Sequence, residues 1–291
     1  MDTVLQLLVE SLFLGTFYAF MSLGFSLTWG VLNIINLAYG SYIILGAYLA
    51  YTLHIYLGLD PVLSLPLSFT GGFLLGLFFQ RFLMNRVMNL EPFMVLILTF
   101  GLDIFIANAL NLIFRADIRS IDVPYAERSH LLGPLIITEV KALVFVLSLI
   151  LTALVYLLLH RTWTGRAIRA VALDREGART VGVSPEKIFL ITSGIGTGIA
   201  LASGNLYGVL QGFTPFDGGM LTVKAFLVSI VGGLGRVESA VAGGLFLGVL
   251  EVFTGFYLGE GWKFFASLIV MFLFLILRPR GLLGGKYYGE T

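Results

Sequence analysis

Long apolar segments alternate with short polar ones along the whole chain, and no polar segment is long enough to form a soluble domain. Apolar segments of about 17–25 residues match the hydrocarbon core of a bilayer when they form helices. The segments are continuous, whereas the strands of a transmembrane barrel alternate apolar and polar residues. The sequence therefore predicts an all-α fold, a polytopic transmembrane helical bundle made by one domain over residues 1–291.

Nine apolar segments are expected to form helices. They are Val4–Thr28, Val31–Tyr56, Val62–Phe79, Phe93–Phe114, Glu139–His160, Ile188–Leu210, Val223–Leu234, Ser239–Tyr257 and Trp262–Leu277. Polar residues and glycine interrupt the start of the second segment, and the seventh is short and ends in glycines. We therefore expect broken or half helices near 31–40 and 223–238, which is the pattern of internal repeats in transporters. Counting the seventh segment as a crossing gives nine spans, which we favour; eight remain if it re-enters.

Basic residues orient these spans, because cytoplasmic loops carry an excess of lysine and arginine. The segment 161–187 is the longest polar interruption in the last two thirds of the chain, and it is rich in arginine. Arg81 and Arg86 indicate a second cytoplasmic loop, and the C-terminal tail is basic too. Residues 115–138 carry balanced charges and fit the outside. We therefore expect the N-terminus outside and the C-terminus inside.

Composition narrows the function classes. Hydrophobic residues make up 58% and charged residues 12%, the net charge is +1, and there is no cysteine. Disulfides, thiolate metal sites and thiol nucleophiles are excluded, and nothing indicates nucleic-acid binding. The metalloprotease, serine-hydrolase and P-loop motifs are absent. We therefore expect a membrane protein that is not an enzyme, with no metal site. If its transport is driven by ATP, the motor is another polypeptide that needs a cytoplasmic dock.

The loop 161–187 is the candidate for that dock. Asp174–Val181 can form two helical turns that stop at Gly182, a C-terminal cap. Glu176-Gly177-Ala178, followed by Gly182, approximates the E-A-A-x-x-x-G coupling pattern of ABC permeases. The candidate coupling residues are Arg166, Arg169, Asp174, Glu176, Ala178 and Gly182. The alternative is an ordinary loop that only follows the positive-inside rule.

Intramembrane polar residues give candidates for a translocation pathway. Asp103 lies midway along its span, where a charge needs a partner or water; it makes either a helix–helix hydrogen bond or a contact with a hydrated pathway. Asn33, Asn36 and Tyr39 beside Gly40 either bond to freed backbone groups or face the same pathway. For Glu251 we favour a structural role. We expect Lys224 to extend its ammonium toward the membrane surface.

Glycines spaced four residues apart predict close helix contacts. Gly72 and Gly76 lie in the third span, and Gly194, Gly198, Gly204 and Gly208 lie in the sixth. Before the sixth span, Ser184-Pro185-Glu186 predicts a helix start with a capping serine and proline at the first helical position.

Several motifs, in the right order, resemble one known family, the inner-membrane permeases of branched-chain amino acid (LIV-type) ABC importers. Residues 36–40 (NLAYG) resemble its N-x-A-[HY]-G element. Residues 165–170 (GRAIRA) and 181–183 resemble the two ends of its cytoplasmic loop. Residues 232–235 with the glycines at 243, 244 and 248 resemble its late glycine motif, and residues 278–284 (RPRGLLG) resemble its C-terminal signature. Glu238 and Ser239 depart from the family's usual proline and glycine.

This resemblance implies a transport subunit in the prokaryotic cytoplasmic (inner) membrane. Its partners would be a second related permease, two ATP-binding subunits, an extracytoplasmic substrate-binding protein and membrane lipid. ATP and Mg²⁺ would bind the partner ATPases, and this chain would hold no cofactor. The resemblance implies uptake of branched-chain or other hydrophobic amino acids. The alternatives are an amide or urea importer, and a secondary transporter or channel working without an ATPase.

Overall fold

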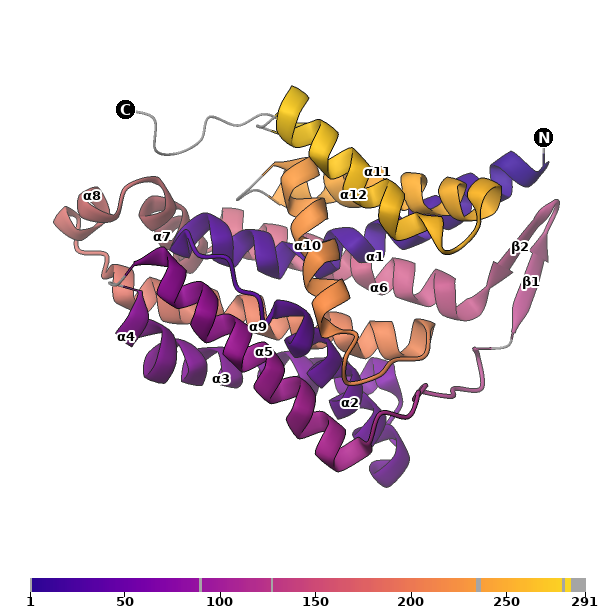
Figure 1. Cartoon of the computed structure of the whole chain (residues 1–291), viewed down its shortest axis with the longest axis horizontal. Coiled ribbons are helices and arrows are strands. Elements are labelled where there is room, and N and C mark those ends of the chain that lie inside the picture. The colour runs from indigo at the N-terminus through magenta and orange to yellow at the C-terminus, as the bar shows by residue number, and fades with distance from the viewer. Residues whose placement is uncertain (1, 89–90, 127, 234–236, 279–280, 284–291) are drawn as a thin grey trace.

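The computed structural model describes residues 2–88, 91–126, 128–233, 237–278 and 281–283, and these residues form a helical bundle (Figure 1). The helices are α1 (Asp2–Leu32), α2 (Tyr39–Leu57), α3 (Pro61–Phe79), α4 (Asn85–Val87), α5 (Pro92–Phe114), α6 (Glu139–Arg161), α7 (Trp163–Leu173), α8 (Arg175–Thr180), α9 (Pro185–Leu210), α10 (Gly218–Gly232), α11 (Val237–Leu258) and α12 (Trp262–Leu277). A π-helical turn, η1 (Gln80–Met84), joins α3 to α4. In the described part, 7 helices are long and apolar enough to cross a membrane, and α10 and α12 are shorter apolar helices. The all-α membrane fold is confirmed.

The bundle has two ends, which we call the α7–α8 end and the hairpin end after the elements they hold (Figure 1). At the α7–α8 end, Arg175 of α8 bonds to the last carbonyl of α1, and His160 of α6 lies 3.7 Å from Glu238 at the start of α11. At the hairpin end, His54 of α2 lies 3.1 Å from the carbonyl of Asp122, and an isolated bridge joins Arg119 to Phe213 beyond α9.

These contacts show the path of the chain. Because α9 finishes at the hairpin end and α11 starts at the α7–α8 end, the chain must cross the bundle between these two helices. Leu282, after α12, donates its N–H to the carbonyl of Val231 at 2.8 Å, which returns the chain to the end of α10. The described helices therefore fit nine passes between the two ends. The short α10 lies where a half-helix was expected, although it starts at Gly218 instead of Val223.

The centre of the bundle is α9, whose residues 194–209 are all buried. Its glycines allow α3 to approach closely: a methyl group on Gly76 would come within 2.5 Å of the Ser193 carbonyl oxygen, and one on Gly194 would come within 2.9 Å of the Phe73 ring. Gly204 faces the backbone of Ile43 in α2 in the same way. The expectation that these glycines mark close helix contacts is confirmed.

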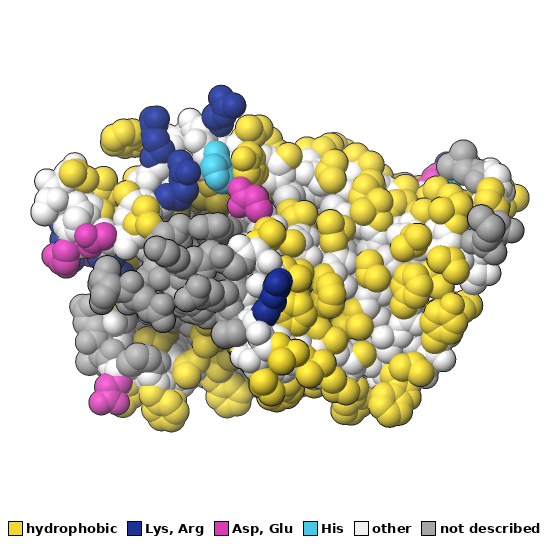
Figure 2. Space-filling view, turned by 90° about the horizontal axis from the view of Figure 1, so that it is seen from above, with side chains coloured by type: hydrophobic (Ala, Val, Ile, Leu, Met, Phe, Trp, Pro, Cys, Tyr) yellow, Lys and Arg dark blue, Asp and Glu magenta, His cyan; other side chains and the backbone are white. Residues whose placement is uncertain are grey.

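Apolar side chains cover much of the outer surface. Leu112 of α5 is 86% exposed and Ile276 of α12 is 75% exposed, which indicates a surface that meets lipid or another subunit instead of water. In Figure 2 the charged side chains gather mainly toward the α7–α8 end, and hydrophobic side chains cover most of the rest of that face. The bundle therefore has the surface of an integral membrane protein.

Several boundaries differ from the sequence predictions. Val31–Tyr56 is not one helix: α1 runs on to Leu32, residues 33–38 are irregular, and α2 starts at Tyr39. This confirms the break near 31–40. Arg81 and Arg86 are not in a loop, because η1 and α4 continue the helical chain beyond α3.

Two local predictions were wrong. The connection 115–138 contains an antiparallel hairpin, β1 (Ser129–Leu132) with β2 (Leu135–Thr138), where no strand was expected. Gln6 of α1 fixes it by donating to the Ile136 carbonyl at 2.9 Å. Ser184 does not cap α9, since its hydroxyl donates to Glu186 at 3.0 Å instead of accepting a backbone N–H. Pro185 does occupy the first turn, as expected.

Candidate functional site

The starts of α2 and α10 meet inside the bundle, and the predicted pathway residue Asp103 lies beside them. Gly40 packs directly on the Gly218 carbonyl, so no side chain fits there. The Gly40 N–H donates to the Thr222 hydroxyl at 2.7 Å, and that hydroxyl donates to the Leu37 carbonyl at 3.0 Å. A side chain of α10 thus supplies the partners that the first turn of α2 lacks.

Asp103 of α5 accepts a hydrogen bond from the Ser41 hydroxyl at 2.5 Å. Ser41 is the third residue of α2, so the carboxylate also lies near the positive end of that helix dipole. The helix–helix hydrogen bond expected for Asp103 is present. The Asp103 side chain is only half-buried, and its contact with a translocation pathway stays a prediction.

The other predicted pathway residues are in two places. Tyr39 is 1% exposed and its hydroxyl donates to the Met21 carbonyl at 2.6 Å, so it holds α2 against α1. Asn36 accepts the Ala38 N–H at 3.0 Å and shapes the irregular segment before α2. Asn33 is exposed just beyond α1 with a positive φ of 58°. The structure brings Tyr39, Gly40 and Asp103 together around the start of α2, and it places Asn33 beyond the end of α1.

The predicted coupling residues lie on two short helices, α7 and α8, and at the ends of α8. The α7 helix, which was not predicted, carries Arg166 and Arg169 on its exposed face, and the Arg166 guanidinium lies 5.3 Å from the Trp163 ring centre. Thr162 caps it by accepting the Gly165 N–H at 3.1 Å. The buried face of α7 packs Ile168 into the core at 1% exposure.

The α8 helix matches the expected two-turn element. Asp174 caps its start by accepting the Glu176 N–H at 3.0 Å, and Ala178 is buried at 3% exposure. Gly182 has φ of 84° beyond its end, where its N–H bonds to the Arg179 carbonyl at 3.0 Å. Arg179 pairs with Glu176 at 3.0 Å and Glu186 at 2.6 Å. The pKa of Arg179 is raised, first by the hydrogen bond to Glu186 and then by the charge of Glu176.

Arg175 connects α8 to two membrane helices, and sequence reasoning did not single it out. Its Nη2 donates to the Leu32 carbonyl at 2.8 Å and lies 3.5 Å from that of Val31. Its guanidinium also lies 5.0 Å from the ring centre of Phe189 in the first turns of α9. The last carbonyls of a helix lack internal partners and carry the negative end of the dipole. Arg175 therefore joins α8 to the end of α1 and the start of α9.

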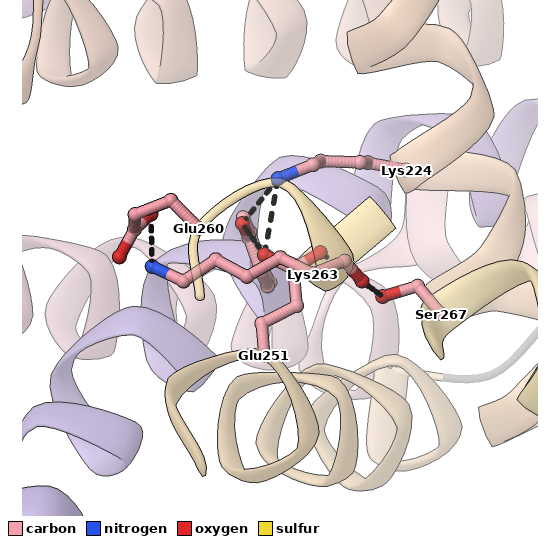
Figure 3. A network of polar contacts seen from close by, with 6 residues as sticks. Lys224, Glu251, Glu260, Lys263 and Ser267 are labelled. Atoms are coloured by element: carbon pink, nitrogen blue, oxygen red, sulfur yellow. Dashed lines mark hydrogen bonds and ion pairs between the residues drawn. The ribbon is translucent and has the colours of Figure 1, made fainter. Parts of the chain in front are cut away.

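A buried ion pair lies deeper in the bundle. Lys224 of α10 and Glu251 of α11 are 3.1 Å apart, with side chains 14% and 1% exposed (Figure 3). The expectation that the Lys224 ammonium reaches the membrane surface is wrong. It pairs instead with the buried carboxylate of Glu251 inside the bundle. Glu251 also accepts hydrogen bonds from Tyr18 at 2.5 Å and Ser267 at 3.2 Å. Its predicted structural role agrees with these contacts.

This pair lines a cavity of about 540 Å³ between α1, α6, α9, α10, α11 and α12. Its wall combines apolar side chains with three acidic residues and three lysines. The charged members are Glu10, Lys141, Lys224, Glu251, Glu260 and Lys263. Besides the buried pair, Lys263 and Glu260 are 2.6 Å apart (Figure 3), and Lys141 and Glu10 are 3.6 Å apart. The sequence did contain a signal for this site: two opposite charges, 27 residues apart, in neighbouring apolar segments.

Comparisons with known proteins agree with this architecture. A family model described as "Branched-chain amino acid transport system / permease component" matches residues 7–277. The high-affinity branched-chain amino acid transport system permease protein BraD of Pseudomonas aeruginosa is 29% identical over 297 residues, covering 96% of this chain and 95% of BraD. Two permease proteins of the corresponding Escherichia coli system also match. LivH is 27% identical, covering 96% of this chain and 95% of LivH; LivM is 25% identical, covering 91% and 67%. No solved structure matches.

Proposed function

The chain belongs to the family of branched-chain amino acid transport permease components, and from this premise we propose that it is the permease subunit of an ABC importer for branched-chain and other hydrophobic amino acids. The observation that carries the proposal is the match of the family model to residues 7–277, which includes the helices of the bundle and the α7–α8 segment. The motor is a separate ATPase, and ATP with Mg²⁺ binds there and not on this chain.

Uptake by the reconstituted importer tests this proposal. The chain would be assembled with its partner permease, ATPases and binding protein in proteoliposomes, and ATP-dependent accumulation of labelled leucine would be compared with that of urea and acetamide. We expect leucine uptake that requires ATP inside the vesicles. Uptake of urea or acetamide but not of leucine would show that the chain belongs to an amide or urea importer. Leucine uptake without the ATPase subunits would indicate a secondary transporter.

The partners follow from the same proposal. Escherichia coli has two permease proteins, LivH and LivM, that both resemble this chain, which supports pairing with a second related permease. We infer two ATP-binding subunits at the α7–α8 end and a substrate-binding protein at the hairpin end. Apolar side chains support the first site: Trp163 is 72%, Leu173 57% and Val181 75% exposed near α8. A soluble partner that covers them would remove this apolar surface from water.

We propose that the α7–α8 end is cytoplasmic and that the N-terminus is outside, because the arginines of α7 and α8 follow the positive-inside rule. The chain has no cysteine, so single cysteines can be introduced cleanly. Cysteine in place of Arg175 should react only with reagents that enter the cell, and cysteine in place of Asp122 should react with impermeant reagents. Labelling of position 175 from outside would contradict the orientation.

We infer that α8 transmits the closure of the ATPases, and Gly182 tests its cap. A methyl group on Gly182 would meet nothing within 4 Å, so only its φ of 84° resists substitution. Gly182→Val should cost about 1–2 kcal/mol, which is roughly a five- to thirtyfold loss of ATPase association. Gly182→Asn is the matched control, because asparagine accepts this backbone conformation. The measurement is the amount of ATPase that co-purifies with each variant. Equal amounts with Gly182→Val and Gly182→Asn would rule out a role of the α8 cap in ATPase association.

We infer that Asp103 contacts the translocation pathway. Asp103→Asn keeps an oxygen that can accept the Ser41 bond but removes the charge, so uptake should fall while the melting temperature stays nearly unchanged. Ser41→Ala is the complementary control, which should cost about 1 kcal/mol of stability through the lost hydrogen bond. Normal uptake by a stable Asp103→Asn transporter would show that Asp103 serves only the packing of α5 against α2.

A further inference from the structure

The cavity between α1, α6 and α9–α12 has the chemistry of a ligand site that the family assignment does not describe. At about 540 Å³ its volume lies within the range of small-molecule pockets. We propose that it binds one zwitterionic amino acid with an apolar side chain, with Lys224 contacting the carboxylate and Glu10 the ammonium. This assignment rests on the proposed function and adds to it a recognition site within the membrane subunit itself.

The charge balance of the wall selects the class of ligand. The three acidic residues and three lysines of the described cavity wall form three ion pairs, so the wall has no net charge and favours neither an anion nor a cation. A zwitterion can instead place each of its charged groups beside an opposite one. The remaining wall is apolar and includes Phe13, Phe17 and Val252, which suit an aliphatic or aromatic side chain and would disfavour a polar amide such as urea.

Lys224 has a donor to offer. An ammonium carries three N–H groups, and in the described part of the chain two are used, by the Tyr18 hydroxyl at 2.7 Å and by Glu251 at 3.1 Å. Glu251, in contrast, is surrounded by Tyr18, Lys224 and Ser267 and is 1% exposed. We therefore assign Glu251 to positioning the lysine, and Lys224 to contacting the ligand.

The cavity rim supplies the counter-charge. Glu10 is 37% exposed, accepts a hydrogen bond from Gln6 at 3.1 Å and has a long ion pair with Lys141, at 3.6 Å, whereas Glu260 is held by Lys263 at 2.6 Å. The looser pair separates at a smaller cost, because a partly exposed pair at this distance contributes little. Lys141 and Lys263 begin α6 and α12, so the rim lies toward the hairpin end, where the substrate-binding protein would deliver its ligand.

Equilibrium binding to the permease assembly tests the site without transport. The assembly would be placed in nanodiscs of phosphatidylglycerol, so that no zwitterionic lipid is present, and titrated with labelled leucine. Unlabelled leucine and two analogues would be added as competitors: 4-methylpentanoate, which lacks the ammonium, and 3-methylbutylamine, which lacks the carboxylate. We expect leucine to compete and each analogue to compete at least tenfold less well. Equal competition by 4-methylpentanoate would overturn the zwitterion assignment. A phospholipid that copurifies and blocks leucine would overturn it in favour of a lipid headgroup.

Paired variants separate recognition from folding. Lys224→Met alone leaves a buried carboxylate without its cation and is expected to fold poorly, so the decisive variant is Lys224→Met with Glu251→Gln, which removes both charges. We expect this double variant to fold and to bind leucine at least tenfold more weakly. Glu10→Gln should weaken binding similarly, and Leu14→Trp, which narrows the cavity, should abolish it.

The two proposals fail in different ways. A stable double variant that binds leucine like the wild type overturns the cavity site, whereas the importer function is unaffected if the wild type still accumulates leucine. Conversely, a wild type that binds leucine in nanodiscs but accumulates none with ATP retains the site and overturns the transport assignment. Lys187→Met, at the other end of the bundle, controls for loss of a positive charge and should bind normally.

Discussion

Replacing Gly72 by alanine destabilises the protein, whereas the same change at its neighbour Gly71 does not. A methyl group on Gly72 would lie 2.6 Å from the Thr197 carbonyl oxygen and 2.8 Å from the Gly198 Cα, both rigid backbone atoms of α9. A methyl group on Gly71 would meet Leu49 Cδ2 at an ordinary 3.7 Å. Overpacking typically costs about 1–3 kcal/mol, and alanine is favoured over glycine in a helix by about 0.5–1 kcal/mol.

Thermal melting of the purified assembly checks this pair. We expect a lower midpoint for Gly72→Ala and an unchanged or higher one for Gly71→Ala. The two variants share the helix, the chemistry and the change in propensity, so their difference isolates the contact between α3 and α9. Equal midpoints would mean that α3 can move away from α9 without loss, and the central position of α9 would then need revision.

The sequence predicts the spans well because a helix in lipid must satisfy its backbone internally. Phe93–Phe114 and Trp262–Leu277 match α5 and α12 to within one residue. Prediction was weaker where tertiary contacts decide. The start of α10 at Gly218 depends on its packing against Ser41, and the hairpin depends on Gln6, which is 130 residues from Ile136. No local pattern contains those contacts.

The candidate sites divide in the same way. The α8 cap could be predicted, since Asp174 and Gly182 act within one short segment. The partner of Lys224 could not, because hydropathy alone does not say whether a lysine in an apolar segment extends to water or meets a carboxylate on another helix. The motif residues 279–280 and 284 lie outside the described residues, while Leu282 and Leu283 bond to the end of α10.

Arg175→Ala should reduce substrate-stimulated ATP hydrolysis and uptake together while the ATPases remain bound. The guanidinium bonds to the Leu32 carbonyl at 2.8 Å and lies 5.0 Å from the Phe189 ring centre, so it contacts two membrane helices. Leu32 ends α1, and the irregular residues 33–38 after it lead into α2. A displacement of α8 therefore reaches α1, α2 and α9 through one side chain. A hydrogen bond to a charged group is worth about 1.5–3 kcal/mol, which corresponds to roughly ten- to a hundredfold in rate.

ATPase and uptake assays on the same proteoliposomes measure this loss of transmission. We expect Arg175→Ala to reduce substrate-stimulated hydrolysis and uptake by roughly ten- to a hundredfold, with ATPase co-purification unchanged. Arg175→Lys should have an intermediate effect, because an ammonium keeps the charge but loses the planar contact with Phe189. Lys187→Ala, an exposed cation in the first turn of α9, controls for charge and should behave like the wild type. If Arg175→Ala instead releases the ATPases, Arg175 acts in docking, and motion must reach α1 by another route. The intermediate lysine phenotype distinguishes this link from a general effect of charge, since charge alone would be restored in full.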